Sequence, residues 1–300
     1  MAESAKGQGN AFFGILFAAT VILILAGLLI QLFIVVVNVF SWMKRGSLKP
    51  GDQIITSLAI TKVLYHTASL LEVFSRPYFG KLIVQYLILI KFTVQTLVIS
   101  TIWLSTLLSI FFSFKISNFH NVFFLRLKAI ISERVVYLII ASVVLTLGMS
   151  MTCLLLTFNI FSRNSTTGFL LNYDKSNVCD IFWNIFPLYM YFFASIFLII
   201  SLSFHIWRMK HCGNAISSTD TYHRIIKFTA ISFLVCAVQI TLNLTKQYGF
   251  RFFGVFWMIF IWNMFPILHS MSLIYINTRL RDAFFKCVYC GSSCLFKRNG

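Results

Sequence analysis

Long apolar segments separated by short polar ones dominate the order of residues along the chain. Each apolar segment is continuous over about 20 residues or more, which is typical of a membrane-spanning helix and not of a barrel strand of about ten alternating residues. Seven such segments are predicted, at about residues 11–37, 53–74, 82–114, 135–158, 181–209, 225–244 and 252–276. The pattern predicts one all-α domain over residues 1–300, a bundle of seven transmembrane helices followed by a cytoplasmic tail at residues 277–300.

The composition agrees with lipid as the solvent of this chain. Hydrophobic residues make up 59% of the 300 residues and charged residues only 11%, too few charges to cover the surface of a soluble domain. The first apolar segment exceeds the length of a signal-peptide core, and only Lys6 among the basic residues precedes it. We therefore expect this segment to remain as an uncleaved first span.

The distribution of charge predicts the orientation of the bundle. The net charge is +17, and sixteen Lys and Arg lie in the predicted inner segments against seven in the outer ones. Basic loops stay on the cytoplasmic side and face anionic lipid. We expect an extracellular N-terminus, a cytoplasmic C-terminus and a multi-pass location in the plasma membrane, with lipid rather than nucleic acid as the partner of the positive charge.

Two lysines lie within apolar segments. Lys62 follows Asp52 by ten residues, so it lies roughly 15 Å into a hydrocarbon core about 30 Å thick. A charge at that depth is costly unless it faces the bundle interior and finds partners, either to carry protons or substrate or to pin the packing of helices. The sequence has no acidic residue at a similar depth in another span, which weakens the transport alternative. Lys91 precedes Lys115 by 24 residues, roughly 36 Å along a helix, so it can reach the outer headgroups or lie at the mouth of a cavity.

No pattern in the sequence points to catalysis, to a cofactor or to a metal site, so we do not expect an enzyme. Cys287, Cys290 and Cys294 offer three thiols close to the membrane, which favours palmitoylation over zinc and leaves free thiols as the alternative. Asn164-Ser165-Thr166 is a glycosylation acceptor on the predicted outer side. The sequence leaves a disulfide bond between Cys153 and Cys179 as an undecided alternative.

Six segments resemble those of the bitter taste receptors, the type 2 taste receptor family. They occur in the family's order over nearly the whole chain, whereas Asp-Arg-Tyr after the third span and Asn-Pro-x-x-Tyr in the seventh are absent. The segments are Phe33–Asn38 with Trp42 and Lys44–Arg45, Asp52–Ile54 with Leu58–Lys62, Leu104–Lys128, Ser201–His205, His223–Lys227 and Pro266–Arg281.

The resemblance implies a G-protein-coupled receptor that detects bitter small molecules and signals through a gustducin-type G protein to phospholipase C and calcium. Alternatives are a vomeronasal type 1 receptor and, more distantly, a small-molecule transporter or channel. The resemblance also implies residues for coupling to the G protein and for activation. They are Lys115, Asn118, Phe119, Arg126, Lys128, His205, Arg224, Lys227, His269, Ser270, Asn277, Arg279 and Arg281.

The chain departs from the family pattern in its outer half and in two polar positions. Val94 and Val98 stand where the family commonly has Trp and Asn, Gln31 stands where it has Asn, and Lys62 where it has Arg. A ligand pocket there is expected to be more apolar than usual. Helical spacing places Lys91, Val94, Gln95 and Val98 on one face of the third span, and the residues predicted to line the pocket are these four with Gln239 and Trp262.

Overall fold

The computed structural model of the protein is all-α. It describes residues 2–78, 84–116, 126, 129–131, 133–163, 169–211, 216–244 and 246–298. Asn118, Phe119, Lys128 and Asn164 therefore lie outside the described residues. The side chains of Lys91, Lys115, Cys153, Cys179, His205, Gln239, Cys290 and Cys294 are likewise not described, although these residues lie on described helices.

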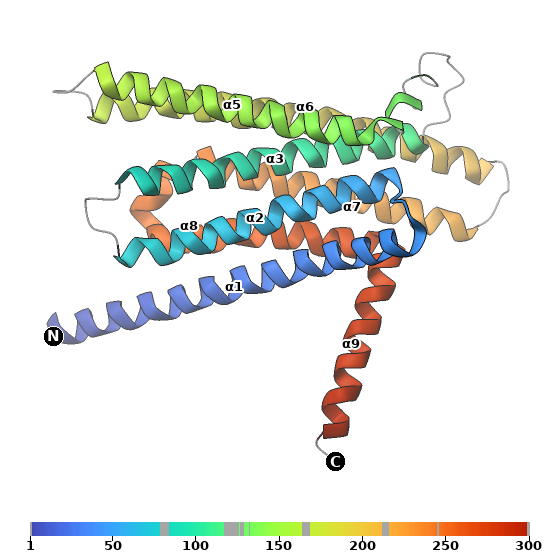
Figure 1. The fold of residues 1–300 in the computed structure, drawn as a ribbon, viewed down its shortest axis with the longest axis horizontal. Coiled ribbons are helices and arrows are strands. Elements are labelled where there is room, and N and C mark those ends of the chain that lie inside the picture. The colour runs from blue at the N-terminus through green and yellow to red at the C-terminus, as the bar shows by residue number, and fades with distance from the viewer. Residues whose placement is uncertain are drawn as a thin grey trace.

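The described part of the chain contains eight long helices, and seven of them run side by side (Figure 1). The eighth, at the C-terminal end, leaves the bundle at a steep angle. The helices are α1 (Ala2–Arg45), α2 (Pro50–Tyr78), α3 (Val84–Ile116), α5 (Val135–Arg163), α6 (Phe169–His211), α7 (Ile216–Leu244), α8 (Lys246–Ile276) and α9 (Thr278–Arg298).

The expected membrane bundle is confirmed. Within the described residues, all bundle helices except α7 contain a segment long and apolar enough to cross a membrane, and α7 packs against α6 and α8 as the seventh member. The N-terminus and the junction of α8 with α9 lie at opposite ends of the bundle (Figure 1). The end at which α1 finishes and α9 begins carries Lys44, Arg45, Arg279 and Arg281, and we call it the inner end because basic residues mark the cytoplasmic side.

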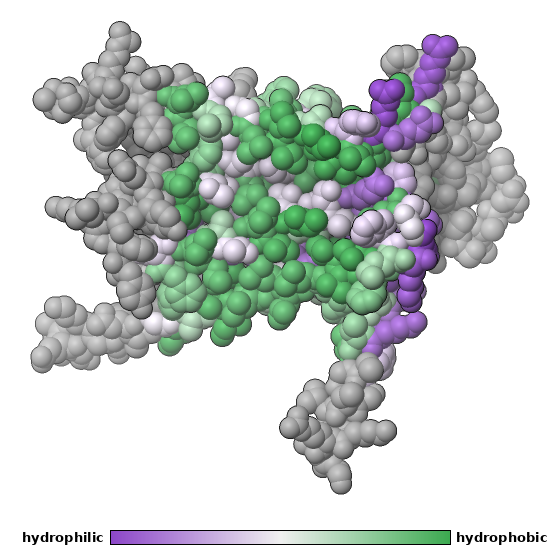
Figure 2. Space-filling model, viewed as in Figure 1, coloured by the Kyte–Doolittle hydropathy of each residue, from purple (hydrophilic) through white to green (hydrophobic). Residues whose placement is uncertain are grey.

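Helix α3 is the central helix of the bundle. It contacts α2, α5 and α6, and 67% of an 18-residue apolar stretch within its segment Phe92–Phe114 is buried, against 22% of Val135–Thr152 in α5. The surface of the bundle between its two ends is mostly apolar (Figure 2). A protein that packs in lipid shows this pattern, because large apolar side chains can face the lipid.

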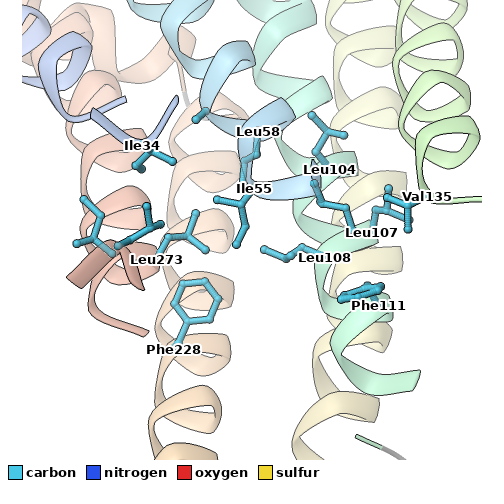
Figure 3. Packing of buried hydrophobic residues seen from close by; sticks show 14 of the residues in the cluster. Ile34, Ile55, Leu58, Leu104, Leu107, Leu108, Phe111, Val135, Phe228 and Leu273 are labelled. Atoms are coloured by element: carbon cyan, nitrogen blue, oxygen red, sulfur yellow. The ribbon is translucent and has the colours of Figure 1, made fainter. Parts of the chain in front are cut away.

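The largest buried apolar cluster lies toward the inner end and joins helices from both halves of the chain (Figure 3). Its fully or nearly fully buried members include Ile34 of α1, Leu58 of α2 and Leu104 of α3, together with Leu280 of α9. Lipid is as apolar as these side chains, so their contribution is close van der Waals packing rather than escape from water. The cluster fixes the inner ends of the helices relative to one another.

The tail that was expected only as a cytoplasmic segment forms the helix α9. Asn277 separates it from α8, and the Asn277 side-chain oxygen accepts a hydrogen bond from the Leu280 backbone at 3.4 Å, as in an N-terminal cap. On one side of α9 Leu280 is buried and the ring of Phe284 meets the ring of Phe33 edge to face at 5.7 Å. Phe285 on another side is exposed. The helix is therefore amphipathic and is held to α1.

Candidate functional site

Lys62 lies at the middle of the bundle and is 1% exposed. Its Nζ lies 2.7 Å from His269 Nδ1, 2.9 Å from Ser270 Oγ and 3.4 Å from the Pro266 carbonyl oxygen, all on α8. An ammonium has three N–H groups and no acceptor, so these contacts use its whole donor capacity. Because His269 Nδ1 must then accept, its proton lies on Nε2.

Ser270 extends this arrangement to α1. Its Oγ lies 2.7 Å from Gln31 Nε2 and 3.0 Å from Gln31 Oε1. Gln31 and Ser270 are both fully buried. We call Gln31, Lys62, His269 and Ser270 the midplane cluster. It joins α1, α2 and α8 through a single positive charge and neutral partners.

A second polar contact lies one helical turn further along α2. His66 Nδ1 is 3.0 Å from Asn263 Oδ1, and Asn263 Nδ2 donates to the Ile259 carbonyl oxygen at 2.9 Å. Gly27 of α1 packs against the imidazole so closely that an added Cβ would lie 2.6 Å from its ring atoms. The glycine thus sets how near α1 and α2 approach, as small residues do in membrane bundles.

A small cavity of about 20 Å³ opens beside Lys62 between α2, α3, α7 and α8, with room for about one water molecule. Its walls include Tyr65, Val98 and Cys236, which also belong to one buried cluster with Ile102 and Tyr191. Thr101 and Ser105 line it too, but both hydroxyls donate to carbonyls of their own helix. The wall is mainly apolar.

Only some of the residues predicted to bind the ligand lie at or beside the cavity. Val98 lines the cavity, and Val94 packs against the same cluster. Gln95 on α3 and Trp262 on α8 are half-buried, outside the described cavity wall. Lys91 lies on α3 and Gln239 on α7.

At the inner end, Arg279 joins three helices. Its Nη1 lies 3.2 Å from Asp52 Oδ2 and 2.7 Å from Ser41 Oγ, and its Nη2 donates to Asn38 Oδ1. Asn38 in turn donates to Thr56 Oγ1 at 2.8 Å. We call Asn38, Ser41, Asp52 and Arg279 the inner clamp. It links the end of α1, the start of α2 and the start of α9.

The residues predicted for coupling and activation fall into two groups. Most of them lie at the inner end. There the side chains of Arg126 and Lys227 are exposed, and that of Arg224 is half-buried. Asn277 caps α9, and Arg281 Nε lies 3.7 Å from Asp282 Oδ1. Lys115 and His205 lie near the inner ends of α3 and α6. His269 and Ser270 lie in the midplane cluster instead, so they can affect coupling only through the arrangement of helices.

Sequence reasoning missed His66, Asn263 and Gly27. His66 lies four residues after Lys62 and Asn263 lies seven before Ser270, so each shares a helical face with a residue that had been singled out. That spacing was the available signal. The tight contact at Gly27 had no signal in the sequence.

Comparison with known proteins adds a separate finding. Residues 9–292 match the family model described as taste receptor protein (TAS2R). The chain is 28% identical to rat (Rattus norvegicus) taste receptor type 2 member 125 over 279 residues, 84% of this chain and 86% of the relative. It is 29% identical to rat taste receptor type 2 member 140 over 283 residues, covering 89% and 90%, and 26% identical to member 39 of Macaca mulatta over 278 residues, covering 86% and 82%.

Proposed function

The chain belongs to the TAS2R family of bitter taste receptors, and on this premise we propose that it binds bitter small molecules in the outer half of its bundle and activates a gustducin-type G protein. Members of this family are multi-pass membrane receptors and not enzymes. The family match disfavours the vomeronasal and transporter alternatives. We further propose that the activated G protein signals through phospholipase C and raises the calcium concentration in the cell.

The observation that carries the proposal is the position of the midplane cluster. Lys62 and His269 form part of the wall of the cavity, and the same two residues connect α2 to α8 and, through Ser270, to α1. A ligand that displaces any of these helices at the outer end changes the contacts of the cluster. Such a differential contact is what lets a ligand shift a two-state equilibrium.

The proposed ligand site consists of Lys91, Val94, Gln95, Val98, Gln239 and Trp262. Val94 and Val98 give the α3 side an apolar surface, with Tyr65, Leu97 and Tyr191 nearby in the same cluster. Apolar ligands with few hydrogen-bonding groups fit this lining best, because a polar group without a partner loses its hydration.

The proposed coupling surface is the inner end of the bundle. It combines the basic residues Arg126, Arg224 and Lys227 with Lys115 and His205 at the ends of α3 and α6. Asn118, Phe119 and Lys128 extend the proposed surface. A basic and apolar surface between helix ends suits an amphipathic helix from a partner.

We also propose two covalent modifications. Cys287 is exposed on α9, and Cys290 and Cys294 follow at spacings of three and seven residues, on the same side of that helix. Palmitoyl chains there would enter the inner leaflet beside the bundle. Asn164 is the proposed glycosylation site.

The test is calcium imaging of cells that express the chain with a chimeric taste G protein, screened against a panel of bitter compounds. We expect a concentration-dependent calcium response to at least one compound. Silence throughout, with the receptor present at the cell surface, would contradict the proposed signalling.

The ligand site is tested with the same response. Gln95→Ala, Gln239→Ala and Trp262→Ala are each expected to shift the agonist concentration for half-maximal response by about tenfold, the equivalent of about 1.4 kcal/mol. Leu89→Ala is the matched control, because Leu89 lies on α3 with its side chain exposed. Unchanged curves for all three variants would place the ligand elsewhere.

A further inference from the structure

Two basic segments meet at one corner of the inner end. Lys44 and Arg45 form the last turn of α1, which ends at Gly46 with a φ of 70° and a backbone hydrogen bond to Trp42 of 2.8 Å, a left-handed helix end that glycine favours. Lys49 follows directly before α2. On the other side, α9 carries Arg279, Arg281 and Lys286 in its first three turns.

Two contacts between side chains bring the two segments together. The Arg279 guanidinium donates to Ser41 Oγ at 2.7 Å, and Ser41 precedes Lys44 by three residues. Further along, the Phe33 and Phe284 rings pack edge to face at 5.7 Å. Figure 1 shows α9 departing from the end of the bundle where α1 finishes, at a steep angle to the other helices. With the bundle across a membrane, α9 follows the membrane surface.

The charges at this corner divide into compensated and uncompensated ones. Arg279 is engaged by Asp52, and Arg281 lies beside Asp282. Within the described residues, no carboxylate lies within ion-pair distance of Lys44, Arg45, Lys49 or Lys286, and all four side chains are exposed. Figure 2 shows hydrophilic side chains gathered at this end of the bundle, against the apolar flank.

Apolar side chains lie beside these cations on α9. Phe285, Val288 and Tyr289 are exposed, at positions where they can enter the acyl region while the cations stay at the level of the phosphates. Lysine and arginine clusters directly beside a spanning helix or on an amphipathic helix attract anionic lipid headgroups. The two segments touch at Ser41 and Arg279, so long cationic side chains on both of them can reach one large headgroup from two sides.

We propose that the corner between the end of α1 and α9 binds a polyphosphorylated inositol lipid of the inner leaflet. Lys44, Arg45 and Lys286 contact its phosphates from two sides, and Lys and Arg are the usual donors to phosphate oxygens. The site is separate from the proposed ligand pocket and does not depend on which G protein the receptor activates.

The experiment uses the full-length receptor in nanodiscs of phosphatidylcholine that carry a small fraction of fluorescent phosphatidylinositol 4,5-bisphosphate. Binding is read as energy transfer from a dye on the receptor. A second set of discs is matched in total charge with fluorescent phosphatidylserine. The variants are Lys44→Gln with Arg45→Gln, and Lys286→Gln alone. Arg134→Gln is the matched control, an exposed cation at the inner start of α5.

We expect each cation removed from the corner to weaken phosphoinositide binding by about fivefold, and Arg134→Gln to change it less than about twofold. We also expect the wild-type receptor to bind phosphoinositide more tightly than phosphatidylserine at equal charge. Equal weakening by Arg134→Gln, or equal binding of the two lipids, would overturn the site in favour of general attraction to the membrane. Unchanged phosphoinositide binding by the Lys286→Gln receptor would contradict the proposal that α9 forms one side of the site.

Discussion

The midplane cluster and the inner clamp perform the same structural task with different chemistry. Each ties α1, α2 and the C-terminal part of the chain through one cation. Lys62 at the midplane is surrounded by neutral acceptors, whereas Arg279 at the inner end faces the carboxylate of Asp52, with side chains 26% and 13% exposed. The medium around each cation therefore decides which kind of partner the cation takes.

The physical reason lies in the desolvation of each group. A carboxylate beside Lys62 would add a second ion to a place without water, and the attraction would repay that cost only with excellent geometry. At the inner end both ions keep contact with water, so pairing them costs little and gains little. We therefore expect the two regions to respond to substitution in different ways.

The largest effect is expected from His269→Leu. It removes an acceptor from a buried ammonium, which should destabilise the receptor by about 3 kcal/mol. The measurement is thermal unfolding of purified receptor in detergent. The double variant Lys62→Met with His269→Leu should recover part of the loss, because it also removes the charge. A double variant less stable than His269→Leu would contradict the role assigned to the charge.

A smaller effect is expected from Gly27→Ala. The added Cβ would lie 2.6 Å from the His66 ring, so α1 must shift, at about 1–3 kcal/mol. Gly14→Ala in the same helix is the control, since a Cβ there meets nothing within 4 Å. Unfolding temperature is again the measure, and equal values for the two variants would show that α1 does not pack as described.

The inner clamp should respond to Asp52→Asn by about 1 kcal/mol or less. Added salt should reduce the difference from wild type, because an ion pair that keeps some contact with water is partly screened, whereas it should leave the effect of His269→Leu unchanged. Asp282→Asn is the control, because its side chain is 65% exposed and its pair with Arg281 should contribute nothing measurable. If salt changed the stability loss equally for the Asp52→Asn and His269→Leu variants, the proposed difference between the inner clamp and the midplane cluster would be wrong.

The smallest effect is expected from Gln31→Asn, which shortens the amide by one methylene and keeps its chemistry. The contact with Ser270 should weaken by about 0.6 kcal/mol, the average for a hydrogen bond between membrane helices. Surface expression and unfolding temperature would fall slightly. A loss as large as that of His269→Leu would mean that Gln31 and not Lys62 organises the midplane cluster.

Much of the fold could be predicted from the sequence because an apolar segment of 20 residues has few alternatives in lipid. Six of the seven predicted segments lie wholly within one helix, and the segment 82–114 overlaps α3 from Val84 onward. The helices extend past the predicted segments because hydropathy marks the apolar part and not the helix ends. Helix α9 was missed because its apolar residues, such as Leu280, Phe284 and Val288, are spaced along one side instead of forming a continuous segment.

The candidate site could be predicted only in part. The depth of Lys62 showed that it needs partners, yet those partners lie more than 200 residues away in the chain. His269 and Ser270 were assigned to activation through the resemblance alone, and only the packing of α2 against α8 places them at Lys62. The pocket residues come from three helices, and their convergence depends on helix rotation, which one sequence does not fix.

The depth of Lys62 also has an electrical consequence. A charge held halfway across the membrane lies inside the transmembrane field, where a full crossing is worth about 2.3 kcal/mol per 100 mV. A shift of α2 by one residue rise, about 1.5 Å of a 30 Å core, moves this charge through roughly one-twentieth of that field, about 0.1 kcal/mol per 100 mV. Depolarisation of the cell therefore changes the energy of such a shift by only about 0.1 kcal/mol per 100 mV, so the charge of Lys62 does not make α2 a voltage sensor.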